Sequence, residues 1–87
     1  MKRAYSRVEE VENVSIEYFV VEGDGFGVGI MESLKDGRVE TDIVYDIFPT
    51  LEKAENMAIT LANHTVFAMS LREILCDYFI GEIKSSA

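Results

Sequence analysis

The strongest constraint on the fold is the spacing of three segments rich in β-branched and aromatic residues, which cover residues 14–21, 26–34 and 38–47. Such residues are typical of strands. Short stretches that contain glycine, residues 23–25 and 35–37, separate the segments and are typical of hairpin turns. Because a crossover between parallel strands needs a dozen or more residues, we predict an antiparallel meander of three strands.

The third segment alternates apolar and charged residues, as a strand with one buried and one wet face does. The predicted buried face consists of Val39, Thr41, Ile43, Tyr45 and Ile47. The predicted wet face carries Glu40, Asp42 and Asp46. This row of carboxylates could bind a divalent cation, but a solvated face that discourages wrong strand pairing is the simpler interpretation.

Two helical segments follow Pro49, which ends the predicted sheet. Thr50 is predicted to cap a helix over residues 51–64, whose apolar residues fall on one stripe. Ser70 is predicted to cap the second helix and Gly81 to end it. Two helices that follow a meander must cover one of its faces, so the predicted class is α+β with the order β-β-β-α-α.

A chain of 87 residues is the size of one domain. We predict that this domain spans residues 13–81, after a polar and loosely ordered segment 1–12 and before a tail, residues 82–87. Val8 and Val11 could instead pair with another segment, which would make residues 1–12 an additional strand. A domain this small buries only about 60% of the surface that its unfolded chain exposes. Association of two copies would therefore add stability.

The stretch EGDGFGVG, residues 22–29, holds four of the six glycines and raises the question of a phosphate-binding loop. It lacks the G-x-G-x-x-G spacing of dinucleotide-binding loops and the Gly-Lys-Ser/Thr ending of Walker loops. Its acidic residues would also repel a phosphate. We interpret the stretch as a turn followed by a strand, in which Gly27 and Gly29 allow close approach of a helix or of Phe19.

The charge of the chain bears on its partners and its location. The net charge is -8, and no Lys or Arg occurs between Val8 and Leu34. Nucleic acids and anionic membranes are therefore not expected as partners. A single cysteine, the absence of a secretory signal pattern and the absence of a long apolar run favour a cytoplasmic protein.

Four segments carry a resemblance to a known family: EYFVVE (17–22), GVGI (27–30), YDIFPT (45–50) and VFAMSLREILCDYF (66–79). Together they resemble a family of short, uncharacterised bacterial proteins from clostridia and related Firmicutes. The resemblance covers roughly residues 14–80 and lies mostly in the hydrophobic pattern. It implies a fold and a cytoplasmic bacterial setting. It implies no catalytic residue, because the family has no assigned activity.

His64 and Cys76 are the only histidine and cysteine of the chain. An antiparallel helix hairpin could bring them together, as nucleophilic catalysis by a Cys-His pair requires. A role for His64 at the end of the first helix is the simpler interpretation. We therefore predict no catalytic, cofactor-binding or metal-binding residue and no cofactor.

The segment between the two helices contains Val66, Phe67 and Met69, which cannot all turn inward. Exposed apolar groups near an acidic surface are typical of a contact site for another protein or a second copy. The alternative is a plug that closes the end of the core. Asp77, on the outer side of the second helix, could engage a basic partner.

The sequence therefore predicts a non-enzymatic interaction or regulatory module, which forms a homodimer at micromolar concentration. One alternative is a small ligand-binding protein or enzyme that uses His64, Cys76 or the aspartates at 42 and 46. Another is an acidic mimic that blocks a nucleic-acid-binding protein.

Overall fold

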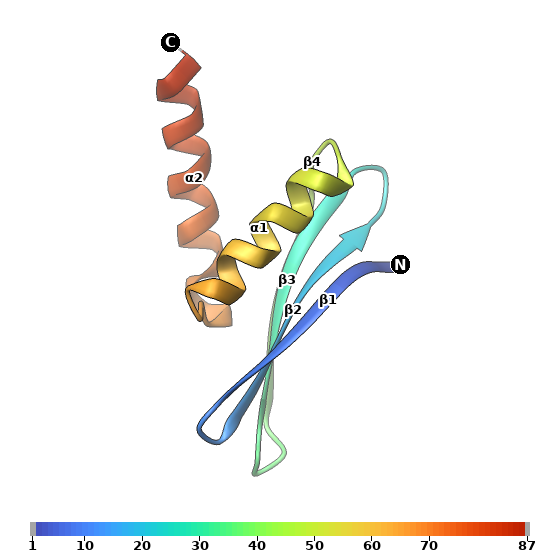
Figure 1. Cartoon of the computed structure of the whole chain (residues 1–87), viewed down its shortest axis with the longest axis vertical. Coiled ribbons are helices and arrows are strands. Elements are labelled where there is room, and N and C mark those ends of the chain that lie inside the picture. Colours follow the sequence, from blue (N-terminus) through green and yellow to red (C-terminus); the bar gives the residue numbers. More distant parts are fainter. Residues whose placement is uncertain (1, 87) are drawn as a thin grey trace.

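The computed structural model describes the backbone of residues 2–86 and the side chains of residues 3–80. Four strands come first: β1 (Lys2–Val11), β2 (Val14–Glu22), β3 (Phe26–Leu34) and β4 (Val39–Phe48). They are followed by helix α1 (Leu51–Asn63), the short 3-10 helix η1 (Ala68–Ser70) and helix α2 (Leu71–Ser86). Both helices lie on one side of the sheet (Figure 1).

The strands form one antiparallel sheet in the order β1-β2-β3-β4. The predicted α+β class and antiparallel meander are confirmed, and the three predicted strands lie within one residue of β2, β3 and β4. The predicted number of three strands is wrong. Residues expected to be loosely held form a fourth strand, β1, which pairs with β2 from Lys2–Glu22 to Val11–Val14.

The polar composition of β1 concealed this strand. Its odd-numbered residues from Tyr5 to Val11 are half-buried toward the helices, but two of them are Arg7 and Glu9. These two side chains satisfy each other, because Arg7 Nε donates to Glu9 Oε1 at 2.7 Å. Charged residues on an edge strand also discourage pairing with other chains. The sequence of β1 therefore does not alternate between apolar and polar residues, although its backbone forms a strand.

The core lies between the sheet and α1. Tyr18, which is fully buried, is the largest side chain that β2 contributes. The stripe predicted for α1 is confirmed by its buried residues, which are Ala54, Met57, Ala58, Leu61 and Ala62. Thr50 caps the helix as predicted, since its hydroxyl accepts the Lys53 N–H at 3.3 Å. His64 is the residue that ends it.

Helix α2 differs from its prediction at both ends. The chain enters it through η1, with the Ser70 N–H donating to the Phe67 carbonyl at 3.0 Å. Ser70 is therefore already helical, whereas an N-cap residue has an extended backbone. Gly81 lies inside α2, which continues to Ser86 through residues predicted to be a tail. A single glycine in a helix costs only about 1 kcal/mol relative to alanine, so it does not force an end.

The face of the sheet away from the helices, called the outer face below, is organised around Gly29. The Phe19 ring lies directly over it, since a Cβ on Gly29 would be 2.5 Å from Phe19 Cζ. This confirms the predicted approach of Phe19. The guanidinium of Arg3 covers the ring at 3.9 Å from its centroid. Phe19 is thereby fully buried without any helix above it.

The faces predicted for β4 are reversed over its first half. Asp42 pairs with Ile30 and so shares the helix side of the sheet, while Ile43 pairs with Gly29 on the outer face. The alternation shifts farther along β4, where Asp46 has a φ of 52° opposite an irregularity between Phe26 and Val28. A carboxylate on the helix side is tolerated because Arg72 of α2 is available to pair with it.

Candidate interaction surface

The linker between α1 and α2, which includes η1, presents its side chains alternately to the core and to solvent. The exposed fractions are 8% for Val66, 39% for Phe67, 4% for Ala68 and 87% for Met69. The prediction that these apolar residues cannot all turn inward is confirmed. Val66 helps to close the core, whereas Phe67 and Met69 remain at the surface.

Two buried hydrogen bonds from the sheet hold this alternation. The Tyr18 hydroxyl on β2 donates to the Val66 carbonyl at 3.0 Å. The Glu32 carboxylate on β3 accepts the backbone N–H of Ala68. A buried polar group that loses its partner costs about 1–3 kcal/mol, so both contacts resist rotation of the linker. Phe67, between the two anchored residues, is held facing outward.

The Tyr18 hydroxyl remains a donor under ordinary conditions. Burial, followed by the negative charges of Glu9 and Glu32, raises the pKa of Tyr18 above its ordinary value. The neutral phenol is therefore favoured even more strongly than in a free tyrosine. The contact to Val66 is consequently insensitive to pH across the neutral range.

An open hollow adjoins Met69, and β4 forms its far side. Its volume is about 340 Å³, and it is lined by Glu40, Thr41, Asp42, Ala68 and Met69. Apolar and acidic groups thus meet at one place. We call the exposed Phe67 and Met69 together with this hollow the linker surface.

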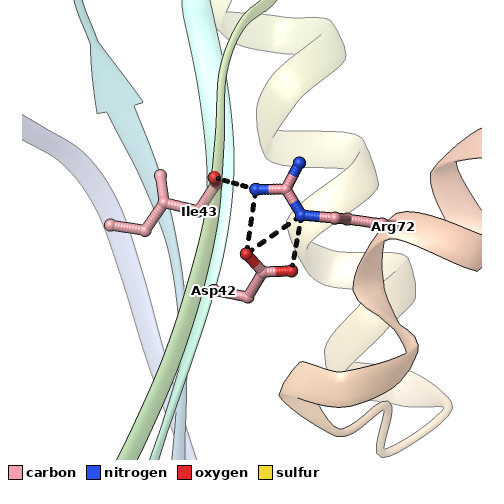
Figure 2. Close-up of polar contacts among 3 residues, drawn as sticks. All are labelled: Asp42, Ile43 and Arg72. Carbon is pink, nitrogen blue, oxygen red and sulfur yellow. Dashed lines mark hydrogen bonds and ion pairs between the residues drawn. The ribbon is translucent and has the colours of Figure 1, made fainter.

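Arg72 connects the start of α2 to β4 beside this hollow. Its Nε and Nη2 atoms donate to the Asp42 carboxylate at 3.0–3.2 Å, and Nη2 also donates to the Ile43 carbonyl at 3.2 Å (Figure 2). The Arg72 side chain is largely exposed, and such surface pairs contribute about 0–1 kcal/mol. The bridge thus orients α2 more than it stabilises the fold.

A second hollow, of about 210 Å³, lies between α2 and β4. It is mostly apolar and is lined by Val44, Ile47, Arg72, Leu75, Cys76 and Phe79. Cys76 is an exposed free thiol here. His64 is not among the lining residues; its backbone N–H instead donates to the carbonyls of Thr60 and Ala62 at the end of α1. The histidine and the cysteine therefore have separate structural surroundings.

The two aspartates of β4 also serve separate contacts. Asp42 is paired with Arg72, while Asp46 accepts the Gly25 N–H at 3.1 Å and so braces the turn between β2 and β3. Within the side chains that the structure describes, no group of three or more His, Cys, Asp or Glu residues is arranged to hold a metal ion. Asp77 is exposed on α2.

Sequence reasoning missed the residues that shape the linker surface, namely Tyr18, Glu32 and Arg72. For Glu32, the sequence pattern could have predicted a buried carboxylate. Strand alternation places it on the same face as the buried Val28 and Ile30, where a carboxylate requires a hydrogen-bond donor. The donor itself lies 36 residues away in the sequence, so its identity could not be read from local spacing.

A model of a family of unknown function, DUF6514, matches residues 2–81. The chain belongs to this family. The match agrees with the expected membership of an uncharacterised family, and the DUF6514 region includes β1 as well as α1 and most of α2. No curated protein and no solved structure matches the chain. In the part of this DUF6514 chain that the structure describes, no helix is both long and apolar enough to cross a membrane.

Proposed function

We propose that this DUF6514 protein is a non-enzymatic interaction or regulatory module that binds a basic, partly apolar segment of another protein at the linker surface. A homodimer is one form of the module. The observation that carries the proposal is the outward display of Phe67 and Met69 by a linker that the sheet anchors on both sides.

The anchoring supports binding because it reduces the ordering cost of association. A backbone that is already held in place loses less conformational entropy when a partner covers its side chains. Met69 is unbranched and adaptable, and such residues recur at surfaces that accept apolar side chains. Phe67, whose side chain is partly exposed, adds a second apolar group two residues away. The two residues together could act as the energetic centre of a contact.

The charges around the linker surface favour a basic partner. Each arginine of the chain already pairs with a carboxylate: Arg3 with Glu17, Arg7 with Glu9, Arg38 with Asp36 and Arg72 with Asp42. Glu40 borders the hollow beside Met69, and Glu73 and Asp77 are exposed on α2. Complementary charge would steer a Lys- or Arg-rich segment to this surface.

The acidic-mimic hypothesis is a special case of this proposal. It holds if the basic partner uses the same surface to bind nucleic acid. Competition between the protein and a short DNA duplex for the captured partner separates the two versions. A ligand-binding role would instead use the apolar hollow at Cys76.

We propose that the module works in the cytoplasm of a clostridial or related firmicute bacterium. This setting is supported by the resemblance of its segments to short bacterial proteins of that group. The net charge of -8 favours solubility, as such a module requires.

The test is quantitative affinity capture from an extract of the native cells, followed by mass spectrometry. The wild-type protein is compared with a Phe67→Ser/Met69→Ser double variant. The control is Ile80→Ser, which removes an exposed apolar group on α2 that neither proposed contact uses. A basic partner retained by wild type and control but lost by the double variant supports the proposal. Equal retention by all three proteins refutes it.

Salt dependence gives a second readout on the same partner. Electrostatic attraction between exposed charges is screened at about 0.5 M salt, where the Debye length falls to a few ångströms. Capture should therefore weaken strongly between about 0.05 M and about 0.5 M salt. Capture that strengthens with salt would point to purely apolar contact and would contradict a basic partner.

A further inference from the structure

The outer face of the sheet carries apolar groups that the helices do not cover. Val8 on β1 and Val39 on β4 are each more than half exposed, although they lie on opposite edges of the sheet. The register places Val8 in one cross-strand row with Glu17, Met31 and Thr41. It places Val39 in another row with Glu10, Ser15 and Ser33. Apolar residues are thus present across the full width of this face.

The glycines of β3 leave space for neighbouring groups in the middle of this face. Gly29 is covered by the flat Phe19 ring, and a Cβ on Gly27 would lie 2.8 Å from the Tyr45 Cα. Tyr45 itself is half exposed on β4. The space that these glycines leave is occupied by the Phe19 ring and by the Arg3 guanidinium that lies on it, so flat, stacked groups form the centre of the face on which a second sheet would pack.

The outer face is also the least acidic part of the sheet. The register directs Glu9, Glu32, Glu40 and Asp42 to the helix side. The outer rows contain the carboxylates Glu10 and Glu17. Glu17 is neutralised locally, since Arg3 Nη1 lies 2.6 Å from its Oε2 and the Ser6 hydroxyl donates to the same atom at 2.6 Å.

This distribution decides which partner fits. Two copies that each carry a net charge of -8 repel each other over most of their surfaces. They approach at lowest cost on the outer face, where Arg3 pairs with Glu17 and Glu10 is the remaining carboxylate of the outer rows. A basic partner, in contrast, gains little from a face on which Arg3 already neutralises Glu17.

The size of the face is sufficient for a weak dimer. Four strands about 4.8 Å apart and nine residues long at about 3.3 Å each cover roughly 19 by 30 Å, or about 570 Å² before side-chain relief. Stable interfaces bury about 600–1,000 Å² of accessible surface per partner. Most of the face must therefore be covered, including both edges.

We propose that a second copy of this chain docks on the outer face, so that two sheets pack face to face. This assignment deepens the homodimer part of the proposed function and rests on it, but it is independent of the linker surface. The contact combines apolar groups with the Arg3–Glu17 pair, and Val8 and Val39 lie at its two margins. Aligned sheets pack at an angle of about 30° because each is twisted.

The test is light scattering and sedimentation velocity of the purified chain, from about 1 to about 200 µM, with reductant present to keep Cys76 reduced. Wild type should dimerise with a dissociation constant of ~1–100 µM. A Val8→Glu/Val39→Glu variant places like charges in the contact and should raise this constant at least ~10-fold. The matched control, Phe67→Glu/Met69→Glu, adds the same charge on the helix side and should dimerise as wild type.

The salt dependence of dimerisation distinguishes this contact from one in which an acidic surface of one copy binds a basic surface of the other. Screening of the repulsion between two acidic copies should strengthen the dimer as salt rises. Circular dichroism verifies that both double variants remain folded, which the exposure of all four residues favours.

Each outcome has a distinct meaning. A monomer at all concentrations overturns the homodimer and the face assigned to it, while the linker proposal stands or fails on partner capture alone. A dimer that survives Val8→Glu/Val39→Glu but is lost in Phe67→Glu/Met69→Glu overturns the outer face and transfers self-association to the linker surface. A dimer insensitive to both overturns the assignment as well.

Discussion

The two faces of the sheet bury large side chains in different ways, and adjacent residues of β2 show the contrast. Tyr18 points to the helix side, where α1 and the linker cover it and its hydroxyl holds the Val66 carbonyl. Phe19 points to the outer face, where it is equally buried by Gly29 beneath it and Arg3 above it. A strand can therefore be buried on both faces in a sheet that has helices on only one.

This difference separates two roles within a small domain. The helix side uses buried hydrogen bonds to hold Phe67 and Met69 outward in an acidic region. The outer face uses a glycine to make room for the Phe19 ring and an ion pair with Arg3 to neutralise Glu17. The first arrangement suits a basic partner, and the second suits another copy of the chain.

The largest expected effect comes from removing the ring on the outer face. Phe19→Ala should reduce the free energy of unfolding by about 3–5 kcal/mol, because a fully buried ring is replaced by a cavity. Leu61→Ala, on the helix side, provides the comparison and should cost about 2–5 kcal/mol. Urea denaturation measures both. A loss below about 1 kcal/mol for Phe19→Ala would mean that the outer face is not a true core.

A smaller loss is expected when the space beneath the ring is filled. Gly29→Ala should cost about 1–3 kcal/mol, because the new methyl group would meet the Phe19 ring at 2.5 Å. Combining it with Phe19→Leu should cost less than the sum of the two single changes. A double-mutant cycle by urea denaturation measures this coupling. Strict additivity would show that the ring and the glycine do not depend on each other.

On the helix side, Tyr18→Phe removes the hydroxyl and leaves the Val66 carbonyl without its donor. The expected cost is about 1–2 kcal/mol, together with increased motion of the linker. Tyr45→Phe is the matched control, since that ring is half exposed, and it should change stability by less than about 0.5 kcal/mol. Equal effects of the two substitutions would contradict the anchoring role of Tyr18.

The smallest effect concerns the ion pair on the outer face. Burial raises the pKa of Glu17, but the hydrogen bond from Ser6 and the charge of Arg3 outweigh it, so the pKa lies below its ordinary value of 4.5. A carboxyl with a lowered folded pKa stabilises the protein above its unfolded pKa, and this stability is lost as pH falls through the folded pKa. Glu17→Gln should therefore reduce the loss of stability between about pH 5 and about pH 3. Urea midpoints across this range test it; identical pH profiles would contradict the pairing.

Much of the fold could be predicted because it follows from local spacing. The strands at 14–22, 26–34 and 39–48 and the stripe of α1 were accessible from period-two and helical patterns. β1 was not, because Arg7 and Glu9 occupy its half-buried positions and satisfy each other there. An edge strand with one neighbour needs less apolar surface than a central one, so its pattern is weak.

The candidate site was predictable only in part, for a related reason. An apolar stretch between two helices signalled that some of its residues would be exposed, and Phe67 and Met69 are. Which residues turn outward depends on Tyr18 and Glu32, which lie 48 and 36 residues from their partners. The position of Asp42 likewise depends on Arg72, 30 residues away. Contacts between residues so far apart in the sequence cannot be predicted from the local spacing of residue types.

The most direct test of the anchored linker is amide hydrogen exchange measured by NMR. The Ala68 N–H is bound by a buried carboxylate, so it should exchange at least ~100-fold more slowly than the neighbouring Phe67 N–H, an amide of a surface-facing residue. Glu32→Gln should reduce this protection, while Glu40→Gln, at an exposed position, should leave it unchanged. Exchange of Ala68 as fast as that of Phe67 in the wild-type protein would contradict the account, because the linker would then not be held with Phe67 and Met69 outward.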